Sequence, residues 1–302
     1  MMLSCNTNKL RGSLHFNHSL KRLNTWRVGG AAECFFKAED ADALTYFLRY
    51  CVADYPIFYL GLGSNVLVRD KGIRGIVISL GYGFSWIEQR SDDTICAGAA
   101  TSCAQLARFY VNHGMSGLEF MVGIPGTLGG AMKMNAGAFG GEIWDHVAAV
   151  ETISRDGTKK RYMRDEIDVG YRYVDMPADE CIISGEFKRS PSTEDKTRLQ
   201  AQLKEYLNAR NQSQPVNVPT CGSVFKNLQG SSAAQLIEGC GLKSYTVGGA
   251  TVSEKHANFI VNKGDATAAD IEELIAHIQS TVNARSGVQL QPEVVIVGEQ
   301  HD

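Results

Sequence analysis

The feature that most constrains this chain is a glycine-rich segment, residues 123–141, which reads GIPGTLGGAMKMNAGAFGG. It holds seven of the chain's 31 glycines, and apolar residues such as Ile124 and Phe139 stand between them. Glycine lets the backbone approach a flat or charged ligand closely and adopt positive φ angles, whereas a flexible, solvated linker would be more polar. The segment therefore predicts a buried cradle for a ligand, with a simple hairpin turn at Asn135 and Gly137 as the alternative.

A second glycine-rich turn favours the cradle. Residues 61–65, Gly-Leu-Gly-Ser-Asn, lie between two apolar runs with the pattern of strands, residues 57–60 and 66–68. Successive backbone N–H groups in such a turn form a concave site for anionic oxygens, and a diphosphate suits it. Because Val66 interrupts the G-x-G-x-x-G fingerprint, the predicted nucleotide-binding fold is not the doubly wound one.

The composition is that of a globular chain with a small-molecule ligand. Its 302 residues are 44% hydrophobic, and the formal net charge of −3 gives no overall attraction to nucleic acid or an anionic membrane. The chain shows neither a signal-peptide core nor a run of ~20 apolar residues, which predicts a cytoplasmic protein. The eight cysteines form no C-x-x-C pair, so we expect reduced thiols and no metal site.

Hydrophobic spacing predicts the elements of the N-terminal part. Asp40 caps a helix that packs on a sheet, and a second helix runs from Ser102 to about Gly114. Strand patterns follow at residues 57–60, 66–68 and 76–80, and again over residues 147–187 with a turn at 156–157.

The C-terminal part mixes helix and strand. Thr267 and Asp270 form the capping-box start of a long amphipathic helix, and Gly287 ends it. A β run at residues 293–297 follows. A polar, partly helical stretch precedes this part, so we divide the chain into a leader (1–20), a large domain (21–190), a linker helix (191–214) and a C-terminal domain (215–302).

Several polar residues are candidates for chemistry, each with a plainer structural alternative. Ser223, Lys226 and Asn227 stand together in CGSVFKN and either converge on an anion or form an ordinary surface turn. Arg172 is either functional or a surface cation stacked on its neighbouring tyrosines. Glu293 follows a proline at the start of the last predicted strand, where a carboxylate is ordinarily exposed to solvent and has no functional role. His256 is interpreted as structural and is left outside the site.

Several motifs, in the order in which they occur along the chain, resemble those of the UDP-N-acetylenolpyruvoylglucosamine reductase family, which are flavoenzymes of peptidoglycan precursor synthesis. The resemblance covers roughly residues 20–298. It rests on NTWRVGG at 24–30, LGLGSNVLVRD at 60–70, GIPGTLGGAMKMNAGAFGGEI at 123–143, Tyr171-Arg172, Gln214-Pro215, GSVFKN at 222–227, SEKHANFIVN at 253–262 and Pro292-Glu293-Val294.

The resemblance implies an α+β fold: an FAD-binding domain of the vanillyl-alcohol-oxidase type (PCMH type), in two subdomains, followed by a smaller α+β substrate-binding domain. It implies FAD and NADPH as cofactors and a UDP-sugar as substrate. NADPH would give a hydride to the flavin, the flavin would give a hydride to C3 of the enolpyruvyl group, and a proton would reach C2. The product would be UDP-N-acetylmuramate.

The resemblance also assigns site residues. Arg172 would polarise the substrate carboxylate, Glu293 would assist that carboxylate or hold the proton network, and Ser223 would donate the proton to C2. Lys226 and Asn227 would contact the substrate's diphosphate or sugar. The FAD would be held by Gly61, Gly63, Ser64, Asn65, Gly123, Ile124, Pro125, Gly126, Gly129, Gly130, Asn135, Ala136 and Gly137.

The chain departs from the family pattern at three positions. Val174, Leu228 and Val295 stand where many members have a serine, a proline and, in some, an arginine. The chain also lacks the insertion that carries a tyrosine loop in one subgroup, so it resembles the shorter subgroup. Two alternatives remain: another flavin enzyme on the same fold, such as an oxidase, and a nucleotide-sugar-binding protein without redox activity. No residue clearly matches the covalent flavin tether of many such oxidases, and Arg172, Ser223 and Glu293 count against the binding protein.

Overall fold

The computed structural model describes residues 10–52, 54–91 and 94–300, which fold as two compact units. Of the described residues, the first unit comprises those within 10–16, 34–61 and 75–210, and the second comprises those within 17–33, 62–74 and 211–300. Each unit is thus assembled from separated pieces of the chain, whereas we expected contiguous domains. The reason is long-range strand pairing, which local sequence patterns do not reveal.

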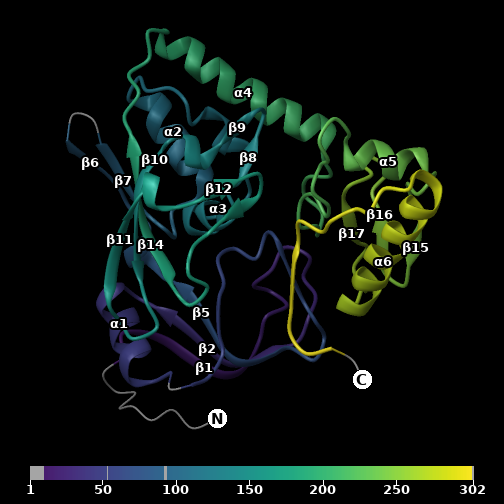
Figure 1. Cartoon of the computed structure of the whole chain (residues 1–302), viewed down its shortest axis with the longest axis horizontal. Coiled ribbons are helices and arrows are strands. Elements are labelled where there is room, and N and C mark those ends of the chain that lie inside the picture. The colour runs from purple at the N-terminus through teal and green to yellow at the C-terminus, as the bar shows by residue number, and fades with distance from the viewer. Residues whose placement is uncertain (1–9, 53, 92–93, 301–302) are drawn as a thin grey trace. The chain divides into compact units, whose positions relative to one another are not determined.

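A four-stranded sheet, most of whose residues belong to the first unit, has one helix packed on it (Figure 1). The strand order is β1 (Gly12–Ser19), β2 (Ala31–Ala38), β5 (Ile73–Leu80) and β3 (Ile57–Tyr59). Helix α1 (Ala41–Tyr50) begins as predicted, since Asp40 Oδ1 accepts the N–H of Ala43 at 2.9 Å. Phe36 and Phe47 stack at 4.1 Å between sheet and helix and anchor a common core.

A second, five-stranded antiparallel sheet forms the rest of the first unit's framework. Its order is β11 (Lys159–Met163), β10 (Val147–Ile153), β14 (Cys181–Lys188), β7 (Thr94–Gly98) and β6 (Ile87–Ser91). Helix α2 (Cys103–Asn112) starts with the capping box of Ser102 and Gln105 and shares one core with this sheet. Short helix α3 (Leu128–Lys133) also packs on β14.

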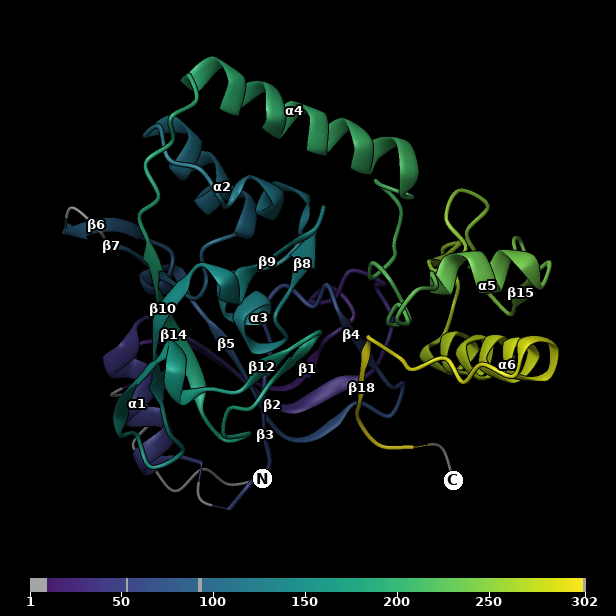
Figure 2. The same cartoon turned by 45° about the horizontal axis from the view of Figure 1, so that its top comes forward.

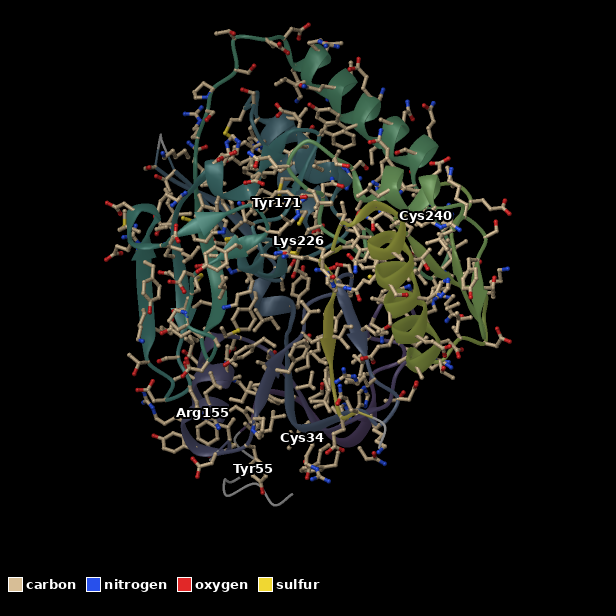
Figure 3. All side chains as sticks on the ribbon, turned by 45° about the vertical axis from the view of Figure 1, so that its right-hand side comes forward. Cys34, Tyr55, Arg155, Tyr171, Lys226 and Cys240 are labelled. Atoms are coloured by element: carbon tan, nitrogen blue, oxygen red, sulfur yellow. The ribbon has the colours of Figure 1, made fainter. Side chains whose placement is uncertain are left out.

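Two arginines tie the two sheets of the first unit together. Arg155, beyond β10, donates to the carbonyl oxygen of Tyr55 at 2.7 Å, and both residues lie at the same end of this unit in Figure 3. Arg49 of α1 donates to the carbonyl oxygen of Asp156 at 3.2 Å in the β10–β11 turn. That turn lies at the predicted positions 156–157.

The glycine-rich segment contains a hairpin, as one of the two interpretations predicted, but the turn lies at Phe139 and Gly140 and not at Asn135 and Gly137. It begins at the end of a 3₁₀ helix (Glu119–Gly123), forms α3, and closes with the hairpin of β8 (Gly137–Ala138) and β9 (Gly141–Glu142). Phe139 and Gly140 adopt positive φ at its tip, and Phe139 stacks on Tyr206 at 4.4 Å. A second short hairpin pairs β12 (Val169–Gly170) with β13 (Tyr173–Val174).

The region predicted as a linker is helical. Helix α4 (Lys196–Ser213) is a single long helix (Figure 2) that carries Tyr206. The predicted leader behaves differently, because residues 12–19 form β1 at the edge of the four-stranded sheet. Its few apolar residues, such as half-buried Leu14, gave little strand signal. Residues 1–9 of the predicted leader lie outside the described residues.

The second unit packs two helices with short strands around its own core. Helices α5 (Ala233–Gly239) and α6 (Ala268–Ser286) lie side by side in Figure 2. A three-stranded sheet joins β15 (Thr246–Val247), β16 (Ala250–Val252) and β17 (Ile260–Asn262). Strand β4 (Val66–Val68) pairs in parallel with β18 (Val295–Val297). The predicted capping box and left-handed Gly287 bound α6.

Residues next to β4 bind α6 strongly. The carboxylate of Asp70 accepts the backbone N–H groups of Ala268 and Ala269, each at 3.0 Å. Arg69 makes a bidentate ion pair with Glu272, at 2.7 and 2.9 Å. Because these contacts satisfy the first turn of α6 and complement its dipole, they fix residues 62–74 to the C-terminal part of the chain.

Replacing Asp70 should therefore destabilise the second unit. We expect Asp70→Ala to lower the free energy of unfolding by about 1 to 2 kcal/mol, since two N–H groups of α6 lose a charged acceptor. Urea unfolding followed by circular dichroism measures this. Glu273→Ala removes the same charge from an exposed position of α6 and should change stability by less than about 0.5 kcal/mol. Equal effects of the two substitutions would contradict the capping role.

Two further expectations concern the cysteines and the membrane. Six described cysteines are buried free thiols, at positions 34, 96, 103, 181, 221 and 240. Cys51 is disulfide-bonded, so the expectation of reduced thiols fails there.

None of the helices within residues 10–52, 54–91 and 94–300 combines the length and hydropathy that crossing a bilayer requires.

Candidate functional site

Arg172 in the first unit is held against the glycine-rich segment. It occupies the turn between β12 and β13 with a φ of 53°, next to Tyr171, which Figure 3 labels. Its guanidinium donates to the carbonyl oxygens of Asn135 at 3.1 Å and Gly137 at 2.9 Å. It also lies 4.9 Å from the ring centroid of Tyr171. The side chain is 14% exposed, so Arg172 is a fixed cation and not a mobile surface side chain.

Asn135 is buried and joins the two short hairpins. Its amide nitrogen donates to Glu142 Oε2 at 2.7 Å and to the carbonyl oxygen of Gly170 at 3.0 Å. Its amide oxygen accepts the N–H of Trp144 at 3.3 Å. The Asn135 side chain thus organises the protein around Arg172, although we predicted it as a cofactor contact.

Gly61 lies beside the start of α3. A Cβ on Gly61 would stand 2.9 Å from Thr127 Oγ1, and one on Gly130 would meet only the same oxygen, at 3.6 Å. Gly61, Pro125 and Gly130 are all exposed. These positions therefore form an exposed backbone surface in the first unit, which is tight for a side chain at Gly61 and open at Gly130.

Other residues of the segment are already engaged by protein. The N–H of Gly129 donates to the carbonyl oxygen of Ala99, and the carbonyl oxygen of Gly126 accepts from Cys103. The N–H groups of Ile124 and Ala136 donate to Met121 and Ala131. A Cβ on Gly123 would lie 2.7 Å from the Phe139 ring. The N–H groups of Ile124, Gly129 and Ala136 are therefore already satisfied by protein acceptors.

The turn at residues 62–65 in the second unit fits an anionic group. Gly63 is buried with a φ of 62°, and a Cβ there would lie 2.3 Å from the carbonyl oxygen of Leu23. Among the described residues, no acceptor is hydrogen-bonded to the N–H groups of Gly63 and Ser64. Neighbouring N–H groups left in this state are what a bound diphosphate satisfies.

The second unit brings Asn65, Ser223 and Glu293 together through the backbone. The N–H of Glu293 donates to the carbonyl oxygen of Val224 at 2.8 Å, which places it next to Ser223. The amide of Asn65 donates to the carbonyl oxygen of Glu293 at 3.0 Å, and its own carbonyl oxygen accepts from Val295 at 3.1 Å. Val295, one of the departures from the family pattern, therefore serves the pairing of β18 with β4.

Ser223 is half-buried and precedes Val224, whose carbonyl oxygen accepts the N–H of Glu293. The Ser223 hydroxyl makes no hydrogen bond to any residue that the structure describes. Burial, and then the charge of Glu293, raise the pKa of the nearby Cys221 thiol well above its usual value. Cys221 is thus a neutral, packed group.

Lys226 and Asn227 differ in how they are held. The backbone N–H of half-buried Lys226 donates to the carbonyl oxygen of Gln291. The side-chain oxygen of Asn227 accepts the N–H of Ala233 at 3.1 Å and caps the start of α5. Sequence reasoning gave Asn227 a substrate contact and did not foresee this structural contact.

Two supporting residues were missed from the sequence. Glu142 contacts both Asn135 and Arg172, and only its place in the motif GGEI pointed to it. Asn258 accepts from and donates to the backbone of Phe225, at 2.9 and 2.8 Å, and so holds the Ser223 segment. His256, which we left outside the site, accepts the N–H of Asn258 and packs on Phe259. Burial lowers the pKa of His256.

The described residues fit a nucleotide cofactor, and the fold defines the class of protein. Residues 32–162 match the FAD-binding-domain family, and residues 214–297 match the C-terminal domain of UDP-N-acetylenolpyruvoylglucosamine reductase. The fold is also similar to that of 6-hydroxy-D-nicotine oxidase from Arthrobacter nicotinovorans, with a TM-score of 0.56 at 11% identity over 94% of this chain and 87% of that one. The protein is an FAD-dependent oxidoreductase with a PCMH-type flavin domain and an α+β C-terminal domain.

Two closer relatives settle the family. The reductase of Methylococcus capsulatus is 49% identical over 96% of this chain and 94% of its own length. The crystal structure of UDP-N-acetylenolpyruvylglucosamine reductase from Thermus caldophilus matches with a TM-score of 0.82 and 33% identity, covering 95% of this chain and 99% of that chain. The chain belongs to the UDP-N-acetylenolpyruvoylglucosamine reductase family and is an FAD-dependent reductase.

Proposed function

We propose that this protein reduces the enolpyruvyl group of UDP-N-acetylenolpyruvoylglucosamine to give UDP-N-acetylmuramate, with NADPH as the reductant, in peptidoglycan precursor synthesis. The observation that supports the proposal is the backbone hydrogen bond from Glu293 to Val224, which brings the backbone of Glu293 next to the Ser223 segment. Membership of the reductase family supports the choice of substrate. We further propose that the protein is cytoplasmic, since its nucleotide-sugar substrate and NADPH are small, water-soluble molecules. We expect it to bind neither nucleic acid nor a membrane.

The cofactor would be held by the two glycine-rich regions. In the first unit, the exposed backbone at Gly61 and Gly130 supports this. In the second unit, the N–H groups of Gly63 and Ser64 support it, because no acceptor within the described residues is hydrogen-bonded to them. FAD, when bound, supplies hydride transfer from NADPH to the substrate. The protein's part is to bind, orient and exclude water.

The chain's own side chains would handle charge and proton. Arg172, a cation fixed on two carbonyl oxygens, would bind the enolpyruvyl carboxylate, where negative charge develops as hydride reaches C3. Ser223 would then donate its hydroxyl proton to C2, a short transfer that a weak acid can make to a basic carbon. Glu293 would orient the carboxylate or return the proton, and Lys226 with Asn227 would face the diphosphate or sugar.

The test is a two-step spectral titration without oxygen. NADPH should bleach the flavin absorbance of the purified protein, and UDP-N-acetylenolpyruvoylglucosamine should restore it, with one UDP-N-acetylmuramate formed for each flavin. A buffer addition in place of the substrate is the control. Recovery with oxygen but not with the enolpyruvyl substrate would favour an oxidase, and a protein without flavin would refute the redox function.

A further inference from the structure

Glu142 contacts two residues that hold the site in the first unit. It lies in β9, directly opposite Gly137 in the β8–β9 pair. Its Oε2 accepts the amide N–H of Asn135 at 2.7 Å, and its Oε1 lies 3.8 Å from a guanidinium nitrogen of Arg172. The Glu142 carboxylate thus orients the buried Asn135 amide by a hydrogen bond and attracts the positive charge of Arg172.

The Arg172 contact is electrostatic and not a hydrogen bond. Arg161 and Glu186 in the same unit show the alternative, a bidentate pair at 2.8 and 2.9 Å in which the two groups engage each other fully. At 3.8 Å, Glu142 stabilises the guanidinium by charge without forming that fork. The guanidinium of Arg172 donates at hydrogen-bond distance to the carbonyl oxygens of Asn135 and Gly137.

Glu142 also acts on Arg172 through Asn135. The same amide nitrogen that donates to Glu142 donates to the carbonyl oxygen of Gly170, at 3.0 Å, in the strand that leads into Arg172. Fixing that amide therefore fixes the β12–β13 turn, where Arg172 has a left-handed φ of 53°. A residue in this conformation keeps its place only when its surroundings determine it.

We propose that Glu142 is a positioning residue that holds Arg172 in the orientation needed for the enolpyruvyl half of the reaction. The proposal rests on the proposed function, because it assigns Arg172 to the substrate carboxylate. In the proposed reaction, Glu142 itself contacts neither the hydride donor nor the hydride acceptor. Its loss should slow reoxidation of the reduced flavin by substrate and leave reduction by NADPH unchanged.

The experiment compares two substitutions at Glu142 under anaerobic stopped flow. Glu142→Gln keeps an oxygen for the Asn135 amide but removes the charge, whereas Glu142→Ala removes both. We expect reoxidation by UDP-N-acetylenolpyruvoylglucosamine to slow about tenfold in Glu142→Gln and about a hundredfold in Glu142→Ala, the range found for groups that orient metal ligands. Reduction by NADPH should stay within about twofold of the native rate. Glu186→Gln, which removes the charge opposite Arg161, should change neither step.

A double substitution decides whether Glu142 acts through Arg172. In an Arg172→Ala background, adding Glu142→Ala should leave the reoxidation rate unchanged, because the group being positioned is gone. A further slowing as large as in the native background would overturn the proposal, as would native reoxidation rates in both single variants. If the native protein is not reoxidised by this substrate, the proposed function fails and the inference fails with it. If Glu142→Ala does not fold, Glu142→Gln alone still decides the charge effect.

Discussion

Ser223→Ala is expected to reduce the flavin normally and to lose most of the second half-reaction. The variant lacks the hydroxyl that we propose as the proton donor to C2, and general acids of this kind contribute about 10² to 10⁴ in rate. The hydroxyl makes no hydrogen bond within the described residues, so its removal leaves no buried partner unsatisfied. The effect should therefore fall on chemistry and not on folding.

Anaerobic stopped flow separates the two steps. Flavin bleaching by NADPH should proceed at the native rate, and recovery on adding UDP-N-acetylenolpyruvoylglucosamine should be slowed. Ser231→Ala, a matched substitution in the same unit, should leave both rates unchanged. If Ser223→Ala slows both steps equally, the serine serves cofactor binding or folding, and the proton must come from another group.

Trp26→Ala is expected to cost about 3 to 5 kcal/mol of stability, as loss of a large buried side chain does. Trp26 is fully buried in the core of the second unit, where it packs with residues such as Leu67 and Val252. Its indole N–H donates to the carbonyl oxygen of Ile260 at 2.8 Å, and its own carbonyl oxygen accepts from Asn262 at 2.8 Å. The substitution therefore leaves a cavity and removes a hydrogen bond to β17.

The two contributions can be separated. Trp26→Phe keeps most of the ring volume but removes the indole N–H. The carbonyl oxygen of Ile260 still accepts a hydrogen bond from the hydroxyl of Thr220 at 2.8 Å. This variant should therefore lose only about 1 kcal/mol of stability, from the lost hydrogen bond. Tyr82→Ala is the surface control, since Tyr82 is 88% exposed. Urea unfolding by circular dichroism gives all three values. A Trp26→Ala midpoint equal to the native one would contradict the assignment of Trp26 to the core.

The resemblance gave the fold class and cofactor correctly, because several motifs in a fixed order carry far more information than any one of them. The site residues stay predictions. The structure shows that some of them have structural contacts. Asn135 donates to the carbonyl oxygen of Gly170, Asn227 accepts from Ala233, and the N–H of Gly129 donates to Ala99. A motif names residue types in order, but it does not say whether an amide faces a ligand or a neighbouring strand.

The sequence by itself determined the local elements. The caps of Asp40 and Thr267, the helix start at Ser102 and the helix end at Gly287 lie where they were predicted, because helix ends are decided by a few adjacent residues. Only the tertiary structure decided that β4 pairs with β18, and that Arg172 rests on the carbonyl oxygens of Asn135 and Gly137. Such contacts join segments distant in the chain, and no local pattern of hydrophobicity or turn residues specifies the partner.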